Sequence, residues 1–210
     1  MHEYESQISF EDVTNIQFTS GTTGFPKGAA LHHHGLLNNA YFCGQLQDWT
    51  HEERVMICSP MYHTLGVVCG MLSSLSFAST MVFASESFDV KELVPVLEKE
   101  RATAVIAVPT MLISLLDYVK ASKQDFDLGP LRTGLIAGSI LPPVIMQRLS
   151  DELGMNEITN QYGMTETSPI SFGTFAKESF EKKTTTVGRI HPNVECKIID
   201  SEGRVVERGQ

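Results

Sequence analysis

The chain has 210 residues, 42% of them hydrophobic and 20% charged, which is enough to bury one large core or two small ones. Its formal net charge is -9 and it has no cluster of Lys and Arg, which argues against a nucleic-acid-binding surface. No apolar run reaches the ~18 residues of a membrane span, and residues 1–11 lack the apolar core of a signal peptide. The sequence therefore predicts a globular protein of the cytoplasm that binds no nucleic acid.

The four cysteines follow no C-x-x-C spacing, so they do not form the usual zinc pattern. Cys43, Cys58 and Cys69 stand among apolar neighbours, whereas Cys196 lies in a more polar segment. We expect buried thiols in a reducing compartment in preference to a disulfide.

In the first half of the chain, strand-like and helix-like segments alternate. We expect strands at 13–19, 54–59 and 80–84, and helices at 32–49, 65–77 and 90–99. The second of these helices is apolar on nearly all sides, which indicates burial. Asp89 is placed to cap the third helix, with Glu92 three residues on as in a capping box.

The same alternation continues in the second half. We expect strands at 103–108, 131–137 and 157–161, and helices at 110–120 and 143–153, the latter begun by Pro142 and Pro143. Beyond residue 187 the pattern changes, and segments 194–200 and 204–207 predict a β-hairpin.

This order of elements predicts an α/β fold in which a parallel sheet is layered with helices on both faces and a β-hairpin lies at the C-terminal end. We assign residues 1–186 to a central core and 187–210 to the start of a β subdomain. The chain begins directly on its first strand and ends at the hairpin, so we expect it to be a piece of a longer protein. In such folds ligands bind at the carboxyl ends of the strands.

A loop rich in glycine and threonine follows the first strand. Glycines let backbone approach phosphate oxygens, hydroxyl and amide groups donate to those oxygens, and Lys27 adds a positive charge. The Walker pattern does not fit, because Phe25 and Pro26 separate Gly24 from Lys27 and Gly28 stands where Ser or Thr is required. The residues we expect to bind phosphate are Thr19, Ser20, Gly21, Thr22, Thr23, Gly24 and Lys27.

This segment resembles the signature of the adenylate-forming superfamily, which comprises acyl- and aryl-CoA synthetases, luciferases and peptide-synthetase adenylation domains. The resemblance implies that the loop holds the β- and γ-phosphates of ATP. Further motifs follow in the family's order and extend the resemblance over nearly the whole chain.

Two further motifs follow strands. The segment from Pro60 to Gly66 resembles the family's landmark beside the acyl pocket, which places His63 near the substrate carboxylate and the adenylate. An imidazole there can donate to a developing oxyanion or shape the pocket. The turn Gly138, Ser139 and Ile140 resembles the loop that packs against adenine.

The segment from Gln161 to Thr167 resembles the family's Y-G-x-T-E motif, and Gln161, Gly163 and Met164 are included in the expected nucleotide site. The resemblance implies that Tyr162 stacks on adenine, that Thr165 binds the α-phosphate and that Glu166 holds Mg²⁺. Aromatic faces, hydroxyls and hard carboxylates suit those three partners.

The expected catalytic residues are thus His63, Thr165 and Glu166. Three adjacent histidines, His32 to His34, point in different directions on a helix, so we expect no metal there.

The motif combination is most similar to medium-chain acyl-CoA synthetases. It implies that ATP activates a carboxylic acid, with fatty acids favoured, to an acyl-adenylate, and that coenzyme A then displaces AMP. The family's T-G-D motif and its mobile C-terminal domain with a catalytic Lys are not found in this sequence. We therefore expect these 210 residues alone not to form acyl-adenylate at a useful rate.

Two other functions stay open. An amino-acid adenylation domain usually carries an Asp near position 62 or 63, and no carboxylate occurs between Arg54 and Phe83. A nucleotide-binding module without catalysis of its own is the second alternative. The oligomeric state is left open.

Overall fold

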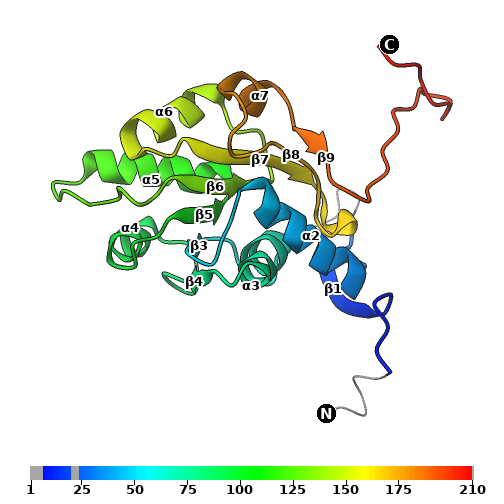
Figure 1. Ribbon diagram of the computed structural model, residues 1–210, viewed down its shortest axis with the longest axis horizontal. Helices are drawn as coiled ribbons and strands as arrows, with labels where there is room; N and C mark the ends of the chain where they lie inside the picture. The colour runs from blue at the N-terminus through cyan, green and yellow to red at the C-terminus, as the bar shows by residue number, and fades with distance from the viewer. Residues whose placement is uncertain (1–6, 20–23, 210) are drawn as a thin grey trace.

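The computed structural model describes residues 7–19 and 24–209 (Figure 1). In these residues a seven-stranded sheet has the order β4-β3-β5-β6-β7-β8-β9, beside a separate two-stranded sheet of β1 and β2. The strands from β4 through β7 are mutually parallel, while β8 and β9 are antiparallel to their neighbours. The strands are β1 (Val13–Thr19), β2 (Lys27–His32), β3 (Arg54–Ile57), β4 (Thr80–Val82), β5 (Ala104–Ala107), β6 (Thr133–Ile136), β7 (Glu157–Gly163), β8 (Ile170–Gly173) and β9 (Arg189–Ile190).

Helices cover both faces of the large sheet, as the sequence predicts. The helical elements are α2 (His33–Leu46), the π-helix η1 (Leu65–Leu72), α3 (Ser73–Ser76), α4 (Val90–Lys99), α5 (Pro109–Ala121), α6 (Pro143–Leu153), the short 3₁₀ turn η2 (Thr165–Thr167) and α7 (Phe180–Thr185). Asp89 caps α4 by accepting the backbone N–H of Lys91. Prolines at the first turn begin α5 and α6, and Gly154 ends α6 in the left-handed region at φ 71°.

The side chains of each central strand alternate between two apolar clusters. Met56 and Val105 belong to the cluster that includes residues of α4, α5 and α6. Val55 and Ile106 belong to the cluster that includes Cys43 of α2 and residues of η1. Because side chains on a strand alternate with a period of two, this division confirms a sheet buried on both faces.

The first predicted strand does not lead directly into a helix. Lys27–His32 forms β2, which pairs antiparallel with β1, so the glycine-rich loop joins the strands of a hairpin. The prediction of a first parallel βα unit is therefore wrong. The cause is that Leu31 packs with Leu36 of α2 and Val68 of η1, a tertiary contact that the local sequence does not display.

The C-terminal part also differs from the prediction. The antiparallel strands β8 and β9 extend the sheet, although we expected neither. The predicted hairpin at 194–207 is reduced to one isolated bridge, Ile199 to Val205, around a turn in which Asp200 accepts the N–H groups of Glu202 and Arg204. This segment runs away from the body (Figure 1), and a strand pair with no further sheet to join gains little stability.

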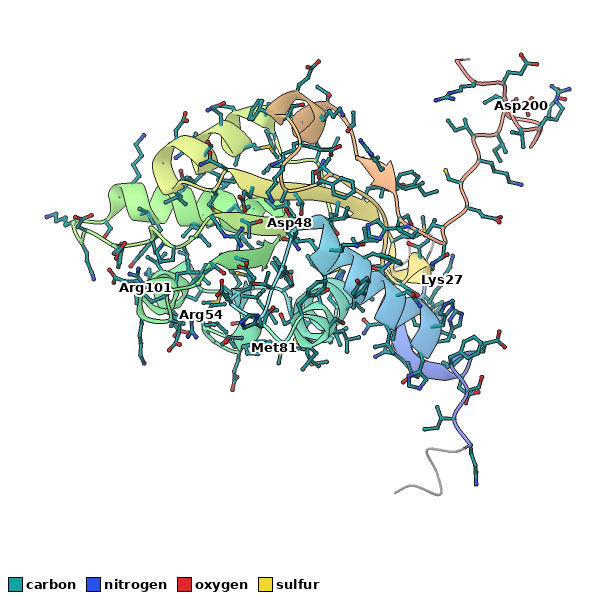
Figure 2. The ribbon with its side chains drawn as sticks, in the orientation of Figure 1. Lys27, Asp48, Arg54, Met81, Arg101 and Asp200 are labelled. Carbon is teal, nitrogen blue, oxygen red and sulfur yellow. The ribbon has the colours of Figure 1, made fainter. Side chains whose placement is uncertain are left out.

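An ion network ties together the amino-terminal ends of the central strands. Arg132 pairs with both Glu53 and Glu157, and Glu53 also accepts the hydroxyl of Thr103. The Glu53 side chain is only 5% exposed, so these partners replace the water that it loses on folding. Beside the network, Arg54 (Figure 2) pairs with Glu100 at 2.6 Å.

The cysteines agree with the expectation of free thiols. Cys43 and Cys69 are buried with their Sγ atoms 3.9 Å apart, Cys58 is half-buried and Cys196 is exposed. Burial raises the pKa of the Cys58 thiol to about 12. In the part of the chain that the structure describes, no helix is long and apolar enough to cross a membrane.

Candidate functional site

A cavity of about 480 Å³ lies at the carboxyl edge of the parallel strands. Val108 follows β5, Ala137 and Gly138 follow β6, and Gly163 ends β7. This is the edge where an α/β sheet accepts ligands, and the volume lies in the range of small-molecule sites. The lining residues are Thr19, His63, Thr64, Leu65, Val108, Ala137, Gly138, Gly163, Met164, Thr165, Glu166, Pro169 and Ile170.

The cavity brings together members of all four sequence motifs. Thr19 comes from the glycine-rich segment, His63 from the second motif, Gly138 from the third, and Gly163 to Glu166 from the fourth. These segments lie far apart in the chain, so their convergence is a property of the tertiary structure.

Other predicted site residues do not line this cavity. Gln161 is buried at 3% exposure, whereas Ile140 and Tyr162 are exposed at 82% and 51%. Ser139, Gly24 and Lys27 are also exposed. Tyr162 lies beside Phe172 with ring centroids 6.2 Å apart. The loop residues Ser20, Gly21, Thr22 and Thr23 lie outside the described residues.

Lys27 is nevertheless placed close to the site. It begins β2 opposite Thr19, whose hydroxyl lies 3.5 Å from the Lys27 carbonyl oxygen. The strand β2 also neighbours the η2 turn, and Figure 2 shows Lys27 beside that turn. The hairpin thus brings the strand that begins at Lys27 into contact with the Thr165–Thr167 turn.

His63 presents a defined donor to the cavity. The backbone N–H of Leu65 donates to its Nδ1 at 3.1 Å, so in the neutral ring the proton is assigned to Nε2. Partial removal of water from the ring lowers its pKa, which favours this neutral form. Nε2–H is then available to an oxygen of a bound ligand.

The Thr165 and Glu166 turn is fastened to the start of β8. The carbonyl oxygen of Pro169 accepts the N–H of Met164 at 2.9 Å and the hydroxyl of Thr167 at 2.7 Å. A Cβ on Gly163 would lie 1.9 Å from that same oxygen, so only glycine allows the two segments to approach this closely.

Glu166 is exposed at the cavity rim. In residues 7–19 and 24–209, no group of three or more His, Cys, Asp or Glu side chains could hold a metal ion. A single carboxylate still fits Mg²⁺ delivered with a nucleotide, because this ion binds through one or two carboxylates and the phosphates of its substrate.

Sequence reasoning assigned no role to Pro169 and Ile170, which form the apolar part of the wall together with Leu65 and Val108. Val108 carried a usable signal, since it ends a predicted strand just before Pro109. Pro169 and Ile170 had none, because the strand β8 was not predicted.

A second cavity of about 300 Å³ lies on the other side of the η2 turn and includes His191. This side chain is 3% exposed, and among the described residues neither ring nitrogen finds a hydrogen-bond partner. Burial lowers the pKa of His191 to about 4, well below the ~6.5 of an unfolded chain.

This histidine makes stability depend on pH. Because the unfolded state binds the proton more tightly, the full stability is present above pH ~6.5 and is lost as the pH falls towards 4, by about 2–3 kcal/mol. We expect His191→Leu to remove this dependence, as measured by urea unfolding at pH 7 and pH 4.5. His51→Leu, at an exposed position, is the control and should retain the slope. An unchanged slope in the His191 variant would show that other groups cause it.

A mostly parallel α/β sheet whose carboxyl edge gathers Thr19, His63 and the turn from Gly163 to Glu166 has the arrangement expected of adenylate-forming enzymes. The profile described as AMP-binding enzyme matches residues 2–210. The chain belongs to the AMP-binding enzyme family.

Curated relatives of this family are acyl-CoA ligases. The chain is 40% identical over 210 residues to the acyl-CoA ligase sidI of Aspergillus fumigatus, covering 100% of this chain and 35% of that protein. It is 39% identical over 212 residues to the mitochondrial medium-chain acyl-CoA ligase ACSF2 of Danio rerio, again covering 100% of this chain and 35% of that protein. The chain thus spans about a third of the length of these relatives.

A solved structure supports the same fold. The o-succinylbenzoate coenzyme A synthetase MenE of Bacillus subtilis, in complex with ATP and magnesium ion, matches with a TM-score of 0.79 and 26% identity. The match covers 96% of this chain and 40% of that one.

Proposed function

We propose that this chain forms the nucleotide- and acid-binding core of an ATP-dependent acyl-CoA ligase. The observation that carries the proposal is the cavity of about 480 Å³, because it joins residues of all four motifs at one sheet edge. In the whole protein, a carboxylic acid would attack the α-phosphate of ATP, release pyrophosphate and leave an acyl-adenylate. Coenzyme A would then take the acyl group and release AMP.

Four side chains would act on the substrates. The Nε2–H of His63 would donate to an oxygen of the substrate carboxylate, and the hydroxyl of Thr165 to an oxygen of the α-phosphate. Glu166 would hold Mg²⁺, which neutralises phosphate charge when bound. Lys27 would add a positive charge beside the β- and γ-phosphates. The segment Ser20 to Thr23 would bind the same phosphates through its hydroxyl and backbone N–H groups.

The adenine contacts are also part of the proposal. Tyr162 is half exposed on the strand that leads into the turn, where its ring is accessible for stacking on a base. Ser139 and Ile140 lie in the exposed turn after β6, where they would pack against the other side of the nucleotide.

The wall formed by Leu65, Val108 and Ile170 favours an aliphatic acid. An amino-acid substrate would require a carboxylate for its ammonium group, and the acidic residue lining the cavity is Glu166, which the proposal assigns to Mg²⁺. We propose a fatty acid of medium chain length, in accord with the name of the ACSF2 relative. The name of that relative places it in mitochondria, which differs from the cytoplasmic location that we predict for this chain.

We keep the proposed division of the chain into a core of residues 1–186 and the start of a β subdomain at 187–210. The support is the course of the chain after β9, where it leaves the sheet and runs away from the body (Figure 1), although β9 itself still pairs with β8 of the core.

If Glu166 holds Mg²⁺, its replacement should affect the binding of ATP with Mg²⁺ more than the binding of AMP without metal. We expect Glu166→Gln to weaken binding of ATP with Mg²⁺ by at least about tenfold, since a charged metal ligand is replaced by a neutral one. Binding of AMP without metal should change less than about twofold. Isothermal titration calorimetry on the 210-residue chain measures both.

Glu181→Gln, in exposed α7, is the matched control and should leave both affinities unchanged. Equal weakening of ATP and AMP by Glu166→Gln would contradict the metal role. Absence of any nucleotide binding by the wild-type chain would contradict the proposed function at the level of this chain. ATP–pyrophosphate exchange with a fatty acid, run on the same preparation, should give no signal above background.

A further inference from the structure

A buried asparagine in α2 is bonded to the wall of the cavity. Asn39 is 6% exposed, and its Oδ1 accepts the backbone N–H of Ile170 at 3.1 Å. Its Nδ2 donates to the carbonyl oxygen of Ile170 at 2.6 Å. The side chain therefore satisfies both backbone groups of one residue, 131 positions away in the chain. Buried backbone groups left without such partners are costly.

The residue held by Asn39 is continuous with the Thr165 and Glu166 turn. Ile170 lines the cavity, and the preceding Pro169 supplies the carbonyl oxygen that accepts from Met164 and Thr167. Fixing the backbone of Ile170 thus fixes the acceptor on which the turn rests.

A second contact comes from the same face of α2. Gly35 stands one helical turn before Asn39, and a Cβ on it would lie 2.7 Å from the Oγ of Ser168. Positions i and i+4 lie on one side of a helix. Gly35 and Asn39 therefore lie on one side of α2, and this side contacts both Ser168 and Ile170.

The helix α2, which carries Gly35 and Asn39, directly follows the hairpin of β1 and β2. α2 begins at His33, directly after β2 ends at His32. One rigid element thus connects the strand that carries Lys27 to the turn that carries Thr165 and Glu166.

We propose that Asn39 is a positioning residue, which holds the Met164 to Ile170 segment in a fixed relation to the hairpin of β1 and β2. It touches no reacting group and acts through the backbone of Ile170. The expected effect of Asn39 on nucleotide binding rests on the proposed function. Its effect on the Met164 to Ile170 segment does not.

The test is hydrogen exchange on wild-type chain and on Asn39→Leu. The Ile170 amide loses its acceptor directly, whereas the Met164 and Thr167 amides bond within the segment and report transmission to the turn. We expect protection at Met164 and Thr167 to fall by about tenfold or more, while Val105 and Ile106 in β5 stay unchanged. Asn38→Leu is the matched control, because Asn38 bonds within its own helix to the carbonyl of His34 and should leave the turn unaffected.

Asn39→Asp adds a rescue that depends on pH. An ionised carboxylate cannot donate to the Ile170 carbonyl, whereas a protonated carboxyl has the same donor and acceptor as the amide. Burial raises the pKa of such an introduced acid. We therefore expect low protection of Met164 and Thr167 at pH 8 and recovery at pH 5.5, with wild-type chain measured at both pH values as the reference.

The nucleotide consequence is measured separately. We expect the affinity of Asn39→Leu for ATP with Mg²⁺ to fall by about tenfold. Unchanged exchange at Met164 and Thr167 in Asn39→Leu would overturn the proposal. The proposal would also be overturned if both Asn39 variants lost as much protection in β5 as in the turn. Asn39 would then support the fold as a whole. If the wild-type chain binds no nucleotide, the proposed function fails while the exchange result still decides the role of Asn39.

Discussion

Replacing Arg132 with leucine is expected to lower the free energy of unfolding by about 3 kcal/mol. The substitution leaves the Glu53 carboxylate, which is 5% exposed, without its cationic partner at the amino-terminal ends of the strands. The hydroxyl of Thr103 stays in place but supplies only one neutral hydrogen bond. A buried, unpaired charge costs more than the lost attraction alone, because water cannot return to solvate it. Urea unfolding at pH 7, followed by circular dichroism, measures the change.

Arg148→Leu provides the matched control. Arg148 also pairs with two carboxylates, those of Glu152 and Asp117, but these side chains are 35% and 63% exposed. Water solvates them after the arginine is removed, so we expect a loss of less than about 1 kcal/mol. Equal losses for the two variants would show that the burial of Glu53 does not govern the effect.

The second large effect is expected from Gly163→Ala. The new Cβ would lie 1.9 Å from the carbonyl oxygen of Pro169 and 2.8 Å from the Cα of Ile170. Both contacts are with backbone, so no side chain can rotate away and β7 must separate from β8. We expect a loss of about 3 kcal/mol in unfolding free energy. Nucleotide affinity, measured by calorimetry, should fall as well, because Pro169 and Ile170 form part of the cavity wall.

Gly154→Ala separates steric from conformational cost. Gly154 has a φ of +71°, yet no atom lies within 4 Å of the position that its Cβ would take. The cost there is the left-handed backbone alone, about 1 kcal/mol, and nucleotide affinity should not change. If Gly163→Ala costs no more than Gly154→Ala, the close approach of β7 and β8 is not required for stability.

The elements of the central sheet were predictable because their information is local. Ala104–Ala107 and Thr133–Ile136 are short runs buried at every position, and the proline that starts α5 stands two residues after the first of them. Asp89 marks the start of α4 because its side chain caps the helix, accepting the N–H of Lys91 only two residues away. Patterns of this kind need no knowledge of distant parts of the chain.

The peripheral strands were not predictable for the opposite reason. β2 depends on packing of Leu31 against Leu36 and Val68, and β8 depends on pairing with β7 and on the amide of Asn39. The segment 194–207 has the alternation of a hairpin but no neighbouring strand to receive it, so it forms a single bridge. In each case a long-range contact, or its absence among the described residues, overrides the local preference.

By itself the sequence determined the class of the protein, because the motif residues and their order are written in the chain and the family match covers residues 2–210. It also determined the alternation of strands and helices, since apolar periodicity records which side of each element is buried. Only the tertiary structure decided that Thr19, His63, Gly138 and Glu166 share one cavity while Tyr162 stays exposed beside it. It alone decided that Asn39 reaches Ile170. The physical reason is that these contacts join segments through the packing of whole layers, and no local pattern of side chains encodes which distant backbone group a buried amide will meet.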